Sequence, residues 1–137
     1  MKRFAACCLC LVATACASAD DASWPFTATP VAEFDEPWAM TFLPDGRLLV
    51  TEKEGRLLVV TQDGSKSAPL AGVPAVAYGG QGGLGDVVLH PGFAENGIVY
   101  LSYAEAGSGN ARGAAVIRAR LALDGSKGGA LEDVEVI

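Results

Sequence analysis

The chain has 137 residues, of which 50% are hydrophobic, 19% are charged and 17 are glycine. This composition supports a hydrophobic core and argues against intrinsic disorder, and the length suffices for one ordinary domain but not for two. The formal net charge is −6; without the leader residues Lys2 and Arg3, eight basic and sixteen acidic residues leave −8. Such an acidic chain with no basic run repels phosphate backbones, which argues against nucleic acid as a partner.

Residues 1–19 have the features of a signal peptide for export. Lys2 and Arg3 give a positive start, residues 4–13 an apolar core, and residues 17–19 a small-residue cleavage site. The apolar run is too short to remain as a membrane-spanning helix. We therefore expect a periplasmic or secreted protein, and we interpret residues 20–33 as an N-terminal linker.

All four cysteines lie inside this leader, at Cys7, Cys8, Cys10 and Cys16. The exported body therefore has no disulfide framework and no thiolate ligands for a metal. Residues 13–16, Ala-Thr-Ala-Cys, also form an acceptable lipobox, in which Cys16 would become the lipidated first residue. Two forms stay open: a soluble exported protein, and an outer-membrane lipoprotein that meets the membrane only through the lipid on Cys16.

From residue 38 onward, short apolar runs alternate with turn dipeptides of the Asp-Gly, Glu-Gly and Asn-Gly type. Runs rich in Val, Leu, Ile and Tyr at this spacing predict antiparallel strands joined by tight turns. No segment has a sustained helical period with caps. The sequence therefore predicts an all-β fold, with strands near residues 38–43, 47–52, 56–61, 84–89, 97–103 and 114–123, and another beginning within 131–137.

A weak internal repeat refines this prediction. In residues 40–50, a strand ends at Pro44, the chain turns at a glycine and a second strand returns; residues 87–101 repeat this order around Pro91. The two prolines are 47 residues apart, close to the roughly 40–50 residues of one four-stranded propeller blade. We expect about two blades of a β-propeller. Because a ring needs about four to eight blades, we expect an N-terminal piece of a longer protein, with exposed apolar faces.

The densest unusual feature is a glycine-rich segment at residues 78–86, with five glycines in the seven residues 79–85. Glycine allows positive φ and close approach of a flat ligand to the backbone. Between Gly80 and Gly82, Gln81 supplies one amide for hydrogen bonds. The segment lacks the lysine and hydroxyl residue of a phosphate-binding loop. A ligand-facing loop and a flexible connection between blades both stay open.

The remaining polar residues are explained locally. His90, the only histidine, precedes Pro91 at a strand end, where we expect it to hydrogen-bond the adjoining turn. Asp86 is interpreted as holding the loop rather than orienting a partner. Turn positions before glycine are held by Asp45, Asp63 and Asp124. No carboxylate cluster has the spacing of a calcium loop, and no hydroxyl nucleophile has a visible base, because His90 is the only histidine.

Several separated motifs follow one another along the chain. They are residues 37–52, 55–57, 80–84, 86–93 and 99–103. In order and spacing these motifs resemble the opening of the soluble quinoprotein aldose sugar dehydrogenases, in the glucose/sorbosone dehydrogenase family. The resemblance runs from about residue 34 to residue 121 and assigns residues 34–137 to the N-terminal part of such a domain.

The resemblance implies a six-bladed propeller that binds pyrroloquinoline quinone and Ca²⁺, oxidises the C1 hydroxyl of aldose sugars to lactones and passes electrons to an acceptor. It implies that Gln81, with Gly80 and Gly82, faces substrate and cofactor. The family's general-base histidine, quinone-binding arginines and most calcium ligands belong beyond Ile137. We therefore expect no catalytic residue, no metal ligand and no activity in this chain alone. One departure is Gly85, where relatives usually carry a larger aliphatic residue.

Two other functions stay open, because a fold does not fix a function. One is a noncatalytic propeller that binds sugars or a partner protein through the same loop. The other is a lactone hydrolase-like propeller, with a metal held by carboxylates and asparagine near the axis. A histidine in a Gly-Arg-Leu context beyond Ile137 would favour the dehydrogenase.

Overall fold

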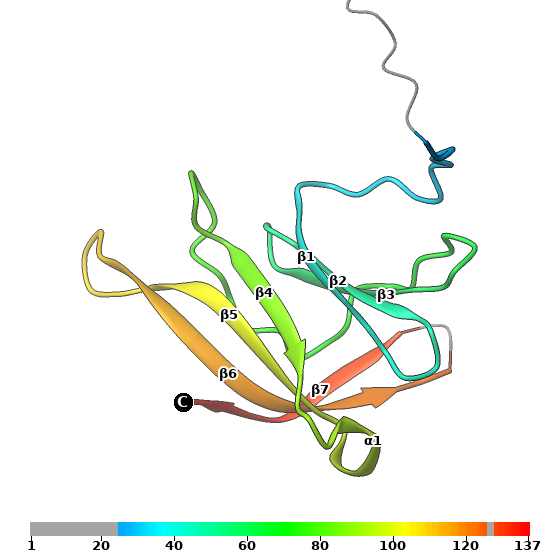
Figure 1. Cartoon of the computed structure of the whole chain (residues 1–137). Coiled ribbons are helices and arrows are strands. Elements are labelled where there is room, and N and C mark those ends of the chain that lie inside the picture. Colours follow the sequence, from blue (N-terminus) through cyan, green and yellow to red (C-terminus); the bar gives the residue numbers. More distant parts are fainter. Residues whose placement is uncertain (1–24, 126–127) are drawn as a thin grey trace, which may run out of the picture.

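The computed structural model describes residues 25–125 and 128–137. The expected signal peptide, its lipobox and the first part of the linker lie outside these residues. The described chain is all-β (Figure 1), as predicted. Its elements are β1 (Pro37–Phe42), β2 (Leu48–Glu52), β3 (Arg56–Val60), β4 (Leu84–Leu89), α1 (Phe93–Asn96), β5 (Ile98–Ala106), β6 (Arg112–Leu123) and β7 (Gly129–Val136). Within the described ranges, no helix has the length and apolar character needed to cross a membrane.

The strands form two antiparallel sheets, ordered β1-β2-β3 and β4-β5-β6-β7, in which each strand pairs with the next along the chain. In the first sheet, Val50 of β2 lies between Met40 and Leu58. In the second, Tyr100 of β5 lies between Val88 and Arg118. Tight turns between successive strands produce this order, because they leave neighbours in sequence as neighbours in space.

The first sheet has an irregular fourth member. After β3 the chain turns back, and the N–H of Ser67 donates to the carbonyl of Val59 at 2.9 Å. The N–H of Leu70 then donates to the carbonyl of Leu57, also at 2.9 Å. Residues 65–70 therefore run along β3 without forming a regular strand. With this segment, the first sheet has four adjacent chain segments, as many as the second sheet.

The main core lies between the two sheets, where β4 packs against β1 and β2. Alternation along each strand directs every second side chain into this interface. Its fully buried side chains include Leu49, Leu57, Leu84, Val87, Val99, Leu101 and Ile117. Burying each such side chain contributes about 1.5–3 kcal/mol before entropy costs are counted. One apolar layer therefore joins the sheets into one unit.

The outer face of the first sheet is only partly covered. Val50, Leu58 and Val60 are buried there against Phe34 of the N-terminal segment. Nearby on β1, the alternate residues Trp38, Met40 and Phe42 are 51%, 64% and 61% exposed. This is the exposed apolar face that the sequence predicts for a small number of blades.

The predicted strands agree with the observed ones except at some ends. The expected strand 97–103 extends to Ala106, and the expected strand 114–123 begins at Arg112, because Ala106 pairs with Arg112. The one-turn helix α1 has no signal in the hydrophobic pattern. It ends where Gly97, at φ +64°, donates its N–H to the carbonyl of Phe93 at 2.8 Å.

Candidate functional site

Residues 79–82, here called the glycine turn, form a tight hairpin turn between the two sheets. The N–H of Gly79 donates to the carbonyl of Gly82 at 3.1 Å, and the N–H of Gly82 donates back at 2.9 Å. Gly80 has φ +58°, whereas the φ of Gln81 is not positive. Glycine first and an ordinary residue second is the pattern of a type II′ turn. Gln81 is thus the one side chain that the turn presents.

The base of the glycine turn is tied to both sheets. The N–H of Ala77 donates to the carbonyl of Ala104 in β5 at 2.7 Å, and the N–H of Ala104 donates to the carbonyl of Gly83 at 2.8 Å. The N–H of Leu84 donates to the carbonyl of Lys53, which follows β2, at 2.9 Å. Each side of the loop therefore has its own main-chain attachment.

A groove of about 410 Å³ runs beside the glycine turn. One side is formed by the loop itself, and the other sides by β1, β5 and the start of β6. Its lining residues are Trp38, Gln81, Gly82, Gly83, Leu84, Gly85, Ser102, Tyr103, Ala104, Arg112, Gly113 and Ala114. The groove therefore combines a glycine wall with a few aromatic and polar side chains, a common composition for a small-molecule site.

Of the three predicted site residues, Gln81 and Gly82 line this groove. Gln81 is exposed, and its side chain makes no hydrogen bond with any residue in the described ranges. Its amide is therefore free to donate and accept toward a ligand. Gly80 is outside the lining, and its carbonyl instead accepts a hydrogen bond from Lys53 Nζ at 2.8 Å.

Two further side chains at the groove were not singled out from the sequence. The indole of Trp38 forms a flat, half-exposed wall. Arg112, at the start of β6, donates from Nη1 to the carbonyl of Gly79 at 3.2 Å and has no ion pair within the described ranges. No local pattern marks Arg112, since it reaches the loop only because β6 pairs with β5.

Gly85, the departure from the family pattern, lies at an irregularity in the pairing of β4 with β5. A Cβ at this position would be 2.6 Å from Ser102 Oγ. That hydroxyl accepts the N–H of Asp86 at 2.8 Å. The Ser102 side chain thus occupies the space that a larger residue at position 85 would need. The Asp86 carboxylate accepts the N–H of Val87 at 2.9 Å rather than holding the glycine turn.

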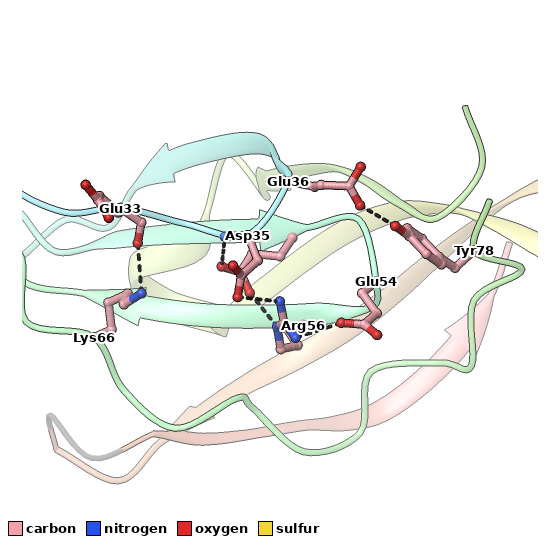
Figure 2. Close-up of polar contacts among 8 residues, drawn as sticks. Glu33, Asp35, Glu36, Glu54, Arg56, Lys66 and Tyr78 are labelled. Carbon is pink, nitrogen blue, oxygen red and sulfur yellow. Dashed lines mark hydrogen bonds and ion pairs between the residues drawn. The ribbon is translucent and has the colours of Figure 1, made fainter. Parts of the chain in front are cut away.

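Next to the glycine turn, Tyr78 donates its hydroxyl proton to the Glu36 carboxylate (Figure 2). This bond is the main reason that the pKa of Glu36 is lowered, and the positive charge of Lys53, 3.6 Å away, lowers it further. The same bond, with the negative charge of Glu36, raises the pKa of Tyr78. The pair therefore holds an ionised carboxylate and a neutral phenol at neutral pH.

A second polar cluster surrounds Arg56, which pairs with Glu52, with Glu54 at 2.8 Å and with Asp35 at 3.1 Å (Figure 2). Glu52 is only 2% exposed and also accepts the N–H of Asp35 at 2.8 Å. Burial raises the pKa of Glu52, but the bonds from Arg56 and Asp35 outweigh burial, so its pKa is lowered. This cluster ties the N-terminal segment to the first sheet.

His90 has the structural role expected from the sequence. Its Nδ1 accepts the N–H of Gly92 at 2.9 Å and lies 3.0 Å from the side-chain nitrogen of Asn96, while its ring stacks on Tyr100. Because Nδ1 accepts the Gly92 N–H, it is not available to a substrate. Two of the predicted turn aspartates, Asp45 and Asp63, accept main-chain N–H groups two residues further on.

Within residues 25–125 and 128–137, no group of three or more His, Cys, Asp or Glu side chains is arranged to hold a metal ion. Asp35, Glu52 and Glu54 converge, but the guanidinium of Arg56 lies among them, pairs with all three and offsets one of their three negative charges. Calcium binding therefore remains a prediction from the family resemblance.

The architecture defines the fold class. Two antiparallel meanders lie face to face, and the first strand of the second sheet packs on the first sheet, which is how consecutive blades of a β-propeller are arranged. The sequence profile of the Glucose / Sorbosone dehydrogenase family matches residues 34–137, and the chain belongs to this family.

Known relatives agree with this assignment. Aldose sugar dehydrogenase YliI of Escherichia coli (strain K12) is 45% identical over 112 residues, covering 77% of this chain and 30% of the relative. The crystal structure of the soluble aldose sugar dehydrogenase of Escherichia coli in the apo-form has a TM-score of 0.69 at 43% identity, covering 75% of this chain and 29% of that chain. The PQQ-bound aldose sugar dehydrogenase of Streptomyces coelicolor has a TM-score of 0.67 at 28% identity, covering 78% of this chain and 31% of that chain. The chain thus spans about 30% of the length of the curated relative that it matches.

Proposed function

We propose that this chain is part of an exported quinoprotein that oxidises the C1 hydroxyl of aldose sugars to lactones and passes the electrons to an acceptor. The observation that carries the proposal is an unpaired amide, Gln81, in a glycine-walled groove of a chain that belongs to the glucose/sorbosone dehydrogenase family. The relatives named as aldose sugar dehydrogenases, one of them bound to PQQ, support this choice of substrate and cofactor.

The residues at the groove suit one edge of pyrroloquinoline quinone, which is planar and carries several carboxylates. Gly82 and Gly83 line the groove with main chain alone, and the Trp38 ring offers a flat wall. Arg112 supplies a positive charge, and a guanidinium pairs well with a carboxylate. When bound, the quinone supplies a two-electron acceptor for the sugar C1 hydride.

In this proposal, Gln81 orients the sugar by hydrogen bonding to its hydroxyl groups, and the Trp38 ring helps to exclude water. Neither residue removes the C1 proton. His90 is bonded to its own turn, so we assign the general base to a histidine in a longer form of the protein, as the family resemblance implies. We assign the calcium ligands to that longer form for the same reason.

We further propose that residues 1–19 direct export to the periplasm or beyond, since their charged start, apolar core and small-residue site are those of a signal peptide. Cleavage before Cys16, with lipidation of that cysteine, is the alternative to cleavage after Ala19. Both routes place the groove in a compartment where extracellular sugars are accessible.

The decisive experiment is dye-linked sugar oxidation. The full-length gene product, loaded with pyrroloquinoline quinone and Ca²⁺, is mixed with glucose or another aldose and an electron-acceptor dye. The proposal predicts dye reduction by the full-length product and none by the 137-residue chain. Sugar binding without dye reduction would support the noncatalytic propeller, and consumption of a lactone would support the hydrolase. Turnover by the 137-residue chain would contradict the assignment of the base.

A further inference from the structure

Lys53 is unusually enclosed for a lysine. It lies between β2 and β3, and only 14% of its side chain is exposed. Lysines are seldom buried to this degree unless their charge is paired. Here Nζ donates to the carbonyl of Gly80 at 2.8 Å and lies 3.6 Å from a Glu36 carboxylate oxygen. The ammonium group is therefore directed at the glycine turn, not at bulk water.

Two aromatic rings complete its surroundings. Nζ lies 6.0 Å from the centre of the Trp38 ring and 5.7 Å from the centre of the Tyr78 ring. A cation at such distances from an aromatic ring is attracted to the negative potential of the ring face. Tyr78 is fixed in turn by its hydrogen bond to Glu36 (Figure 2). The ammonium thus connects β1, the N-terminal segment and the glycine turn.

The main chain of Lys53 acts on the other side of the turn. Its carbonyl accepts the N–H of Leu84 at 2.9 Å. A Cβ on Gly83 would lie only 2.2 Å from that carbonyl oxygen, so the two backbones are in close contact. One residue of the turn between β2 and β3 therefore holds the loop on both sides of Gln81, at Gly80 through its side chain and at Leu84 through its backbone.

We propose that Lys53 is a positioning residue for Gln81. Its ammonium group fixes the glycine turn in the conformation that presents the Gln81 amide to the groove. This inference rests on the proposed function, in which that amide binds sugar. Without the anchor, a turn in which three of four residues are glycine samples many backbone conformations. Only a fraction of molecules would then bind sugar productively, which weakens apparent affinity in proportion.

The matched control is Lys66. Its Nζ also donates to a main-chain carbonyl, that of Glu33, at 2.8 Å, and it also lies over an aromatic ring, that of Phe34, at 5.1 Å. Lys66→Met therefore removes the same charge and the same two kinds of contact at a place away from the groove. Lys53→Arg keeps a cation that can donate and stack on the rings, and serves as the conservative rescue.

The first experiment measures steady-state sugar oxidation by the full-length gene product carrying each substitution. If the competent fraction falls to about one tenth, Lys53→Met raises KM about tenfold and changes kcat by less than about twofold. Lys53→Arg stays within about threefold of the unsubstituted protein, and Lys66→Met is unchanged. Equal losses in Lys53→Met and Lys66→Met would overturn the proposal, because they would show a general effect of removing a lysine.

A double-mutant cycle tests the route through Gln81. If Lys53 acts by positioning that amide, Lys53→Met adds less than about twofold to the loss already caused by Gln81→Ala. Multiplicative losses would show that Lys53 acts independently and would overturn the proposal. An unchanged rate in Gln81→Ala would refute the proposed role of Gln81, and with it the effect of Lys53 on sugar binding.

Amide hydrogen exchange separates failure of the anchor from failure of the proposed function, because it needs no turnover. In Lys53→Met, the peptide covering residues 76–84 should exchange faster, since the hydrogen bond from Gly82 N–H to Gly79 is no longer held in place. Peptides from β3, which pairs with β2 and with residues 65–70, should exchange at the unsubstituted rate. Unchanged exchange in residues 76–84 would show that the ammonium does not fix the turn and would overturn the proposal.

Discussion

Replacing Gly83 by alanine is the sharpest test of how the loop is held. Gly83 has φ +151°, and its Cβ would lie 2.2 Å from the carbonyl oxygen of Lys53. A non-glycine residue in such a backbone region costs about 1–3 kcal/mol. The contact also forces the two backbones apart and breaks the hydrogen bond from Leu84, which costs about 1 kcal/mol. We expect Gly83→Ala to lower the unfolding free energy by about 3 kcal/mol.

Two alanine substitutions calibrate this value. Gly80 also has positive φ, but a Cβ there meets nothing within 4 Å, so Gly80→Ala should cost only about 1 kcal/mol. Gly113, in β6, meets nothing within 4 Å either, and its alanine variant should be neutral to within about 0.5 kcal/mol. Urea unfolding followed by far-UV circular dichroism gives all three values. If Gly83→Ala costs no more than Gly80→Ala, the close contact with Lys53 does not constrain the loop.

Three other predictions concern the ion-pair cluster and the leader. Arg56→Met leaves the buried Glu52 carboxylate without its cation, so it should lower the unfolding free energy more than Glu52→Gln does. Urea unfolding that gives the reverse order would contradict the cluster. Glu36 and Glu52 both have pKa values lowered from the usual 4.5. The stability that these two ionised carboxylates contribute is therefore complete above pH 4.5 and is lost as the pH falls through their lowered pKa values. The urea concentration at the unfolding midpoint should decrease over this acid range, and it should decrease less in Glu52→Gln. Mass spectrometry of the exported protein should find either Asp20 as its first residue or a lipid-modified Cys16, and an intact leader on exported protein would refute the signal peptide.

The strands were largely predictable, because alternation and turn dipeptides are local signals. The segment 84–89 agrees at both ends with β4. Other ends shift by one or two residues, and the largest difference is at the hairpin end of β5 and β6, where Ala106 and Arg112 carry no β pattern and become strand only by pairing with each other. The helix α1 escaped prediction because four residues are too few to show a helical period.

The candidate site was predictable only in part. The glycine content predicts the loop, and the family resemblance predicts the role of Gln81, because both signals are contained in short stretches of sequence. The anchor at Lys53 lies 27 residues from Gly80 and is brought to it by the packing of one sheet on the other. The burial of Glu52 is likewise invisible, because a charged residue at a strand end is normally solvated. Contacts that depend on how distant segments of the chain pack are therefore not predictable from the local sequence pattern.

The most direct test of the proposed function is Gln81→Ala in the full-length gene product, assayed for sugar oxidation at saturating quinone and Ca²⁺ beside a melting curve. A hydrogen bond to substrate in this groove is worth about 1–3 kcal/mol, so kcat/KM should fall about 10- to 100-fold. The melting temperature should hardly move, because the exposed Gln81 side chain makes no hydrogen bond within the described residues and leaves no cavity when removed. Unchanged kcat/KM would contradict a substrate-facing role for the loop, and a parallel collapse of melting temperature and activity would show that Gln81 is a packing residue.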